Sequence, residues 1–254
     1  MFAFKLLSAL STAALLVSST PVSEEYCCDP SKAVMDLPTN QTALIAPTTA
    51  PLFVMLGVGI QNYTCSSTTS TYASIGAVAS LFDISCLDKT PEFATVQTTA
   101  YEIWSKVPAS IKATTIGSRV FAPFLLGFHY FVTSPSGTGI SPMWDFTSTG
   151  KFAGNATAFV MGAKVGDILA PSAPTTNVDW LALNRVQGSL ASKIFRIDTV
   201  GGQPPTSVSL SLLLFCLKFN TRLTVCSWLC PHLRQIYGEV LPVLIGAFHH
   251  HTRL

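Results

Sequence analysis

Residues 52–58 read LFVMLGV, and this stretch decides the fold class that the sequence predicts. Pro51 precedes the run and Gly59 follows it, so a short apolar segment lies between two residues that interrupt regular structure. Apolar runs of about four to eight residues with such flanks are typical of buried strands, since a helix usually needs about ten or more. We therefore expect a buried strand, which residues 61–65 continue by alternating polar and apolar side chains.

The rest of the chain up to residue 207 repeats this style. Glycine and proline separate its apolar segments at short intervals, and no long segment has the period of a helix. We expect strands at residues 127–132, 143–146, 158–163 and 191–199, a returning strand at 71–74, and either strand or short helix at 77–83, 93–104 and 180–183. Residues 51–207 are therefore predicted to form a mainly β domain, an antiparallel β-sandwich or barrel with few short helices.

The two glycines around Val58 stand where a dinucleotide-binding fingerprint would begin. The third glycine of that fingerprint is missing, because position 62 is Asn, and no helical pattern follows. A dinucleotide site needs a helix N-terminus to hold the pyrophosphate. We therefore expect no nicotinamide or other cofactor, and we interpret Gly57 and Gly59 as positions where the strand bends or another backbone approaches.

The first residues have the three-part layout of a secretory signal peptide. Lys5 is followed by an apolar run of about a dozen residues and then by small residues up to Thr20. The run is shorter than the roughly 20 apolar residues that a membrane-spanning helix needs. We predict a signal peptide at residues 1–20, an extended segment at 21–50, a secreted protein and no membrane span.

The composition agrees with an extracellular glycoprotein. The formal net charge is +2 and only 11% of the residues are charged, so the basic stripe of a nucleic-acid-binding protein is absent. Three Asn-x-Ser/Thr sequons begin at Asn40, Asn62 and Asn155, and each is a potential glycan acceptor in a secreted chain. We expect at least one of them to be glycosylated.

The cysteines indicate disulfides rather than a metal site. Four of the seven lie in the N-terminal half: Cys27, Cys28, Cys65 and Cys86. In an oxidising compartment pairing is the default. Adjacent cysteines rarely bond to each other, so we expect Cys27 and Cys28 to find partners in Cys65 and Cys86, with the connectivity left open. The spacing of zinc ligands is absent, and we predict no metal site.

Residues 208–254 differ in kind from the rest of the chain. No period persists there, and the apolar stretch 210–217 is too short to span a membrane. The Val-Ser pair at 208–209 can be encoded by the sequence that usually starts an intron. We predict that this tail is translated from an unspliced intron or in a wrong frame; the alternative is a genuine C-terminal extension. For this reason Cys216, Cys226 and Cys230 are not taken as ligands.

The candidate binding residues lie together in the middle of the chain: His129, Tyr130, Trp144 and Asp145. An aromatic face beside a carboxylate suits a sugar, and His129 is the only histidine before the tail. The alternative is a half-buried histidine with a core tryptophan and an aspartate in a turn. Neither a Gly-x-Ser-x-Gly elbow nor a His-Glu-x-x-His motif occurs, so no catalytic residue is assigned.

Several segments resemble, in the same order, a family of secreted fungal and bacterial proteins of uncharacterised function. They are residues 57–65, 77–83, 127–131 with Trp144 downstream, 178–181 and 196–205. Some fungal members of that family carry the label malate dehydrogenase. The resemblance implies a β-rich secreted domain without an established activity. It also implies that a cysteine and a final strand should follow residue 207, where this chain departs, so that a sheet edge is left uncovered.

Two classes of function follow from these observations. The first is a secreted, non-catalytic glycoprotein that acts at the cell surface or wall, with wall polysaccharide as a partner. The second is an extracellular hydrolase or carbohydrate-active enzyme in which Asp145, Asp179 or Asp198 works with His129. The second requires these groups to converge on one site. A malate dehydrogenase is a distant third.

Overall fold

The computed structural model describes residues 30–66, 68–119, 124–206 and 219–230, the last of these by its backbone. Eight strands are described, and each runs antiparallel to its neighbours. They are β1 (Phe53–Ser66), β2 (Thr71–Asp83), β3 (Leu125–Thr133), β4 (Ile140–Asp145), β5 (Phe159–Ile168), β6 (Trp180–Gly188), β7 (Lys193–Gly201) and β8 (Phe219–Cys230).

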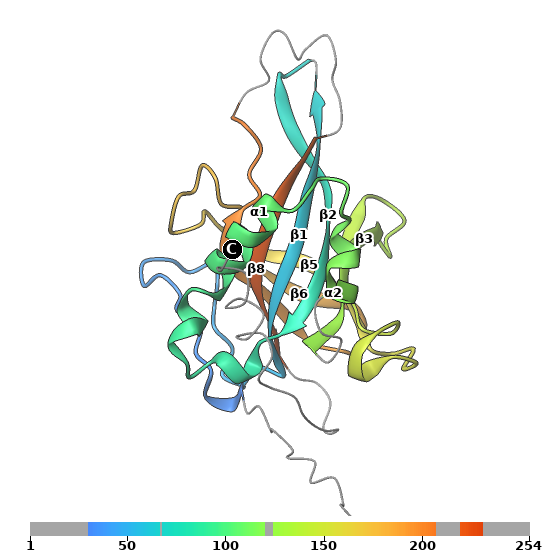
Figure 1. Ribbon diagram of the computed structural model, residues 1–254. Helices are drawn as coiled ribbons and strands as arrows, with labels where there is room; N and C mark the ends of the chain where they lie inside the picture. Colours follow the sequence, from blue (N-terminus) through green and yellow to red (C-terminus); the bar gives the residue numbers. More distant parts are fainter. Residues whose placement is uncertain (1–29, 67, 120–123, 207–218, 231–254) are drawn as a thin grey trace, which may run out of the picture.

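The strands form one closed barrel in which sequence neighbours are also spatial neighbours. The ring closes because β8 pairs with both β7 and β1. The tip of the β1–β2 hairpin projects beyond the other described strands (Figure 1). The prediction of a mainly β, antiparallel fold is confirmed, and of the two architectures that the sequence left open the structure is the barrel.

Few helices accompany the barrel, and all are short. They are η1 (Pro30–Lys32), η2 (Ser85–Leu87), η3 (Pro91–Ala94), α1 (Val96–Lys106), η4 (Ala113–Thr115), α2 (Ile116–Arg119) and η6 (Gly150–Phe152). The segments that were left open between strand and helix are now assigned: residues 93–104 are mostly helical, whereas 77–83 and 180–183 are strand.

The apolar run that opens β1 is buried on both of its faces. Val54, Leu56 and Val58 belong to one hydrophobic cluster and Met55 to another, and successive side chains of a strand point in opposite directions. The inner cluster draws on β1 to β7 and therefore fills the barrel: Met55, Leu81, Leu126, Trp144, Phe146, Val160, Leu183 and Ile194. This double burial explains why the run is continuous rather than alternating.

Helix α1 covers the outer cluster. It packs against β1, β7 and β8 on the outside of the barrel (Figure 1). Trp104 of α1 is 3% exposed and its indole N–H donates to the carbonyl oxygen of Gly59 at 2.6 Å. A tryptophan that is buried needs such a partner for its N–H, so this bond fixes the helix to the strand.

Gly57 and Gly59 lie in β1, and at Gly59 the backbone of β2 approaches closely. The strand continues to Ser66 without passing into a helix. A Cβ on Gly59 would collide with the backbone of β2 at Val78 and Ala79. The interpretation that another backbone approaches here is confirmed for Gly59, and the geometry of a dinucleotide fingerprint is not formed in this strand.

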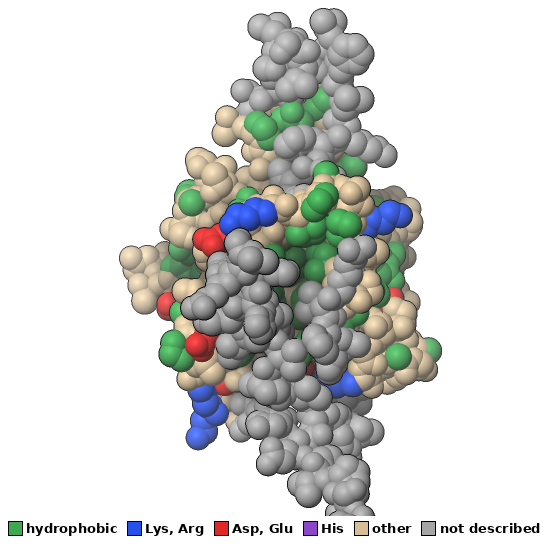
Figure 2. Space-filling model, in the orientation of Figure 1, with side chains coloured by type: hydrophobic (Ala, Val, Ile, Leu, Met, Phe, Trp, Pro, Cys, Tyr) green, Lys and Arg blue, Asp and Glu red, His purple; other side chains and the backbone are tan. Residues whose placement is uncertain are grey.

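Charged side chains are sparse on the face of the molecule that Figure 2 shows. Those that are visible form small patches between apolar and uncharged polar surface. The described residues form two ion pairs, Lys151 with Asp83 and Lys164 with Asp167. Both pairs are at least partly exposed and contribute little to stability.

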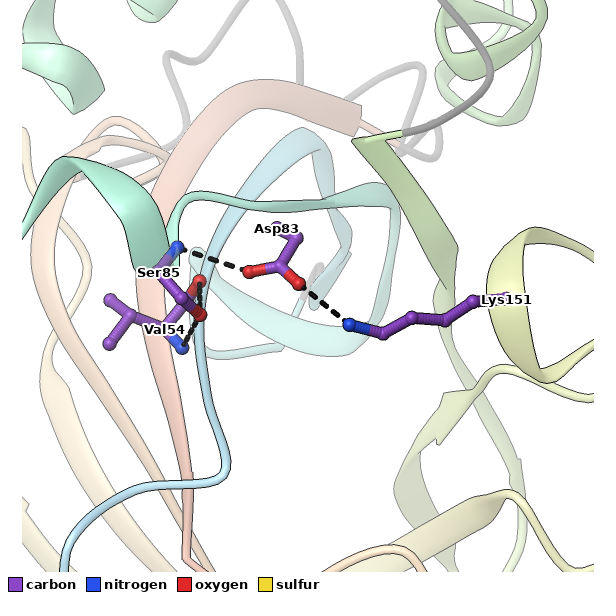
Figure 3. Close-up of polar contacts among 4 residues, drawn as sticks. All are labelled: Val54, Asp83, Ser85 and Lys151. Carbon is purple, nitrogen blue, oxygen red and sulfur yellow. Dashed lines mark hydrogen bonds and ion pairs between the residues drawn. The ribbon is translucent and has the colours of Figure 1, made fainter. Parts of the chain in front are cut away.

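Polar contacts close the base of the barrel, the end at which β1 begins and β2 ends. Asp83 accepts a hydrogen bond from the backbone N–H of Ser85 at 3.0 Å, and it forms an ion pair with Lys151 at 3.1 Å (Figure 3). The Ser85 hydroxyl in turn accepts from the N–H of Val54 at 3.0 Å. The ammonium of Lys151 also lies 5.0 Å from the ring centre of Phe53. These contacts tie β1, β2 and η6 together below the inner cluster.

Strand β8 belongs to the segment that we predicted to be an unspliced intron or a wrong frame. It pairs with β1 along Phe53–Tyr63 and with β7 between Lys193 and Gly201. The uncovered sheet edge that the resemblance implied is therefore occupied in this structure. The backbone pairing does not depend on the identity of the side chains, so a different sequence could supply the same strand.

Candidate functional site

The four candidate binding residues lie on the paired strands β3 and β4, but on two different faces of the barrel wall. His129 is opposite Trp144 in the register, and Phe128 is opposite Asp145. Trp144 belongs to the inner cluster, so its partner His129 also faces the interior. Tyr130 and Asp145 come one residue later on their strands and face outwards. The structure therefore brings these residues together as two separate pairs.

The inner pair is a stack of two rings. The ring centres of His129 and Trp144 are 4.6 Å apart with an interplanar angle of 32°, and Phe131 meets His129 edge-on at 5.4 Å. His129 Nδ1 donates to the carbonyl oxygen of Met143 at 2.9 Å. Burial, with a smaller contribution from the positive charge of Arg196, lowers the pKa of His129 to about 4 despite this bond. The imidazole is therefore neutral at pH 7.

The outer pair is a hydrogen bond between two side chains. The Tyr130 hydroxyl donates to Asp145 Oδ2 at 2.7 Å, and the backbone N–H of Thr147 donates to Asp145 Oδ1 at 2.8 Å. Burial, followed by the bond to Asp145, raises the pKa of Tyr130 to about 12. Burial also acts to raise the pKa of Asp145, but the bonds from Thr147 and Tyr130 outweigh it and leave this pKa below its ordinary value. Both carboxylate oxygens are thus committed to holding the end of β4.

The other carboxylates that a hydrolase would need lie elsewhere. Asp179 precedes β6, and its Oδ1 accepts from Gln203 at 3.4 Å. Asp198 lies in β7, where the register with β8 shifts between Ile197 and Val200. Asp145 is on the outer face at the base end of β4. The histidine and the three aspartates therefore do not converge on one site.

The structure adds Arg196, which we did not select from the sequence. It follows Ile194 by two positions on β7, and Ile194 is in the inner cluster, so Arg196 also faces the interior. Its Nε and Nη2 donate to the backbone oxygen of Asp179 at 3.1 and 2.7 Å. Burial lowers its pKa to about 10, so it stays charged at pH 7. The signal in the sequence was a lone cation between apolar residues of a predicted strand.

Gln61 is a second inward-facing polar residue. It lies on the same face of β1 as Met55 and is 4% exposed. Its amide nitrogen donates to Ser74 Oγ at 2.7 Å and to the carbonyl oxygen of Gly76 at 2.8 Å. Its carbonyl oxygen Oε1 is buried without a hydrogen-bond partner. A buried acceptor that is left unsatisfied is costly and calls for an explanation.

Asp198 combines an unusual backbone with an unusual carboxyl group. Its φ is 50°, in the left-handed region that Asn and Asp tolerate best after glycine. Burial, followed by the negative charge of Asp36, raises its pKa from 3.8 to about 6. The folded protein thus holds this proton more tightly than the unfolded chain, and stability is lost as the pH rises from about 4 through 6.

We expect Asp198→Asn to stabilise the protein by about 1–3 kcal/mol at pH 7, since a shift of one pKa unit corresponds to about 1.4 kcal/mol. At a pH of about 3.5 the gain should vanish, because the carboxyl group is then protonated in both states. Urea unfolding at the two pH values measures the difference. Glu102→Gln on the exposed surface of α1 is the control and should change little. A variant without any gain at pH 7 would contradict this account of Asp198.

The sequons and cysteines are placed as follows. Asn40 and Asn155 are exposed in loops, whereas Asn62 is half-buried within β1. Cys65 lies near the tip of the β1–β2 hairpin and Cys86 in η2, beyond the base end of β2. Cys27 and Cys28 are outside the described residues. Among the described residues no group of three or more His, Cys, Asp or Glu side chains is placed to hold a metal ion. None of the described helices has the length and apolarity to cross a membrane.

Comparison with known proteins assigns the chain to a family. No curated protein and no solved structure matches it significantly. The model of a family described as "Protein of unknown function (DUF3455)" matches residues 46–210. This range holds the first seven strands of the barrel and covers well over half of the 254 residues. The chain therefore belongs to the DUF3455 family, whose function is unknown.

Proposed function

We propose that this protein is a secreted, non-catalytic glycoprotein that binds at the cell surface or wall, with wall polysaccharide as its partner. The observation that carries the proposal is the division of the candidate residues between two faces of the barrel wall. The neutral imidazole of His129 points inwards, whereas the carboxylate of Asp145 points outwards and has both oxygens engaged. A general acid and a general base must both reach one substrate, and these two groups do not.

We propose export because residues 1–20 have the layout of a signal peptide and because the described surface carries few charges. Ser and Thr rather than charged groups solvate the described surface, and two of the three sequons are exposed. Such a surface suits a protein that carries glycans in an extracellular medium.

Disulfides are part of the same proposal, and the fold narrows their pairing. Cys65 is opposite Tyr72 at the tip of the hairpin, and Cys86 follows Asp83 at its base. These two ends are separated by about ten residues of strand, which is roughly 33 Å. Cysteines must have Cα atoms within about 7 Å of each other to bond, which argues against a bond between Cys65 and Cys86. We propose that each bonds to a different cysteine, with Cys27 and Cys28 as the candidates.

Expression in a eukaryotic secretory host tests the export and the glycans together. We expect the protein in the medium, with a mass that falls on treatment with an N-glycosidase. Asn40→Gln and Asn155→Gln should each remove one glycan, because their side chains are exposed. Asn62→Gln should remove none, because this residue is half-buried in a strand. Protein retained in the cell, or a glycan at Asn62 alone, would be the contrary result.

Binding to insoluble wall fractions tests the partner. The purified protein is mixed with chitin, β-glucan and whole-wall particles, and the bound fraction is measured after sedimentation. We expect saturable retention on at least one of them and no release of soluble sugar. Retention on none would overturn the proposed partner. Sugar release that Asp145→Asn or His129→Gln abolishes would instead establish the hydrolase.

A further inference from the structure

We propose that the interior of the barrel, between His129 on β3 and Arg196 on β7, binds a small ligand that carries one negative charge on an apolar body. This site goes beyond the proposed binding at the wall and is independent of it. A polymer would dock on the outside, whereas this ligand enters the barrel.

The two residues face each other across the barrel. In a closed ring of eight strands, β3 and β7 are four strands apart in either direction and therefore lie on opposite walls. His129 is paired with Trp144 of the inner cluster, and Arg196 follows Ile194 of that cluster by two positions, so both side chains are on the inner face. The influence of the Arg196 charge on the pKa of His129 agrees with this placement.

His129 and Arg196 are less completely buried than the inner side chains towards the base. The inner residues towards the base are almost completely buried: Phe146, Val160 and Ile194 are 0% exposed and Trp144 is 4% exposed. His129 and Arg196 are instead half-buried, although both point inwards. Barrels of eight strands are wide enough either to be filled by side chains or to hold one small ligand.

The pairing between β4 and β5 is short. Strands β4 and β5 pair only where Met143–Asp145 meets Phe159–Met161. Beyond Met143 the rest of β4 pairs with β3 alone, and the rest of β5 pairs with β6 alone. The two strands thus stop pairing beyond Met143, one residue past the level of His129, and we place the entry of the ligand there.

The chemistry of the lining selects the ligand. The guanidinium of Arg196 is bonded to a backbone carbonyl, and among the described residues no carboxylate forms an ion pair with it. A charged group inside a protein is normally paired, so this cation is suited to an anionic ligand. Asp179 and Asp167 act on Arg196 from a distance and raise its pKa, which favours a ligand with a single negative charge over one with two.

The remaining surfaces suit an apolar body with a polar edge. Trp144, His129 and Phe131 offer ring faces and edges on one wall. Neutral His129 adds no second charge. The unsatisfied Oε1 of Gln61 lies on the inner face and would accept a hydrogen bond from a donor on the ligand. A monoanion with a flat or aliphatic body meets each of these groups.

Two fluorescent probes that differ in one charge test the site. They are 8-anilinonaphthalene-1-sulfonate and its uncharged counterpart N-phenyl-1-naphthylamine. We expect the wild-type protein to bind the sulfonate at one site, at least about tenfold more tightly than the neutral probe. Arg196→Gln should weaken sulfonate binding about tenfold and change the binding of the neutral probe less than about twofold, whereas Arg196→Lys should keep the preference.

The control is Lys106→Gln, because Lys106 is an exposed cation at the end of α1, on the outside of the barrel. It should leave both probes unaffected. Near-ultraviolet circular dichroism establishes that each variant keeps its native packing. If Arg196→Gln does not fold, the ratio of the two affinities in the wild-type protein and in Arg196→Lys decides the question. Equal affinities, no saturable binding, or an equal loss in Lys106→Gln would overturn the proposal.

Discussion

Ending the chain at Thr206 is expected to abolish the folded monomer. This truncation removes β8 and opens the barrel between β7 and β1. The exposed edge of β1 is long, and both of its faces are apolar. Such an edge pairs readily with other chains, so the truncated protein should aggregate. Size-exclusion chromatography with light scattering, followed by a thermal melt, measures the loss of the monomer peak and of the cooperative transition.

The matched control ends the chain at Cys230 and keeps β8. It should remain monomeric with a melting temperature close to that of the full chain. A monomeric protein ending at Thr206 that melts like the full chain would show that β8 is not needed for closure.

We propose that the natural message replaces residues 208–254 by another ending. What supports this is the change in sequence character at residue 208 and a family match that ends at residue 210. The replacement should supply a strand in the place of β8, together with a cysteine. Sequencing the transcript across the codons of Ser207 and Val208 decides the matter, and a continuous mature message that encodes the present tail would end the idea.

Phe146→Ala is expected to cost about 3–5 kcal/mol of unfolding free energy, which is the usual loss for a buried phenylalanine. Phe146 is 0% exposed, and its ring lies 5.8 Å from the rings of both Phe53 and Phe152. Truncation leaves a cavity among strands that are closed into a ring and therefore relax little. Denaturant unfolding at pH 7 gives the difference from the wild type.

Ile140→Ala on the same hairpin is the matched control. Ile140 is 49% exposed at the other end of β4, so its truncation should change the free energy by less than about 0.5 kcal/mol. Equal losses for the two variants would contradict the assignment of Phe146 to the inner cluster.

The sequence predicted strands well where apolar runs are short and end in glycine or proline. Residues 52–58, 127–132 and 191–199 overlap β1, β3 and β7, respectively. The sequence alone could not distinguish a sandwich from a barrel, because local patterns do not show which strands pair to close a ring. Residues 93–104 became mostly helical because the helix packs its buried Trp104 onto β1, a tertiary contact that no local period reveals.

The candidate site was predicted in part. The aromatic and acidic residues of β3 and β4 lie on paired strands, as their proximity in sequence suggested. Their division between inner and outer faces depends on the register, which places His129 opposite Trp144, and a shift of one residue would exchange the faces. Arg196 comes more than fifty residues later and reaches the site only because β7 lies across the barrel from β3.

The pH dependence of the free energy of unfolding reports the pKa of His129 only indirectly. Its pKa is lowered in the folded state, so its contribution to stability is complete above about 6.5 and is lost as the pH falls from there towards 4. Asp198 has the opposite sign over an overlapping range, because its pKa is raised to about 6. The two effects offset each other in a measurement of total stability, and the histidine has to be observed by itself.

An NMR titration of the His129 imidazole, assigned by comparison with His129→Gln, observes it directly. This ring lies inside a closed barrel, stacked on Trp144 and across from the charge of Arg196. We therefore predict a pKa of about 4 and a neutral ring throughout the physiological range. A pKa at or above the ordinary 6.5 would mean that the ring is solvated, and it would contradict the inward-facing placement on which the proposed site depends.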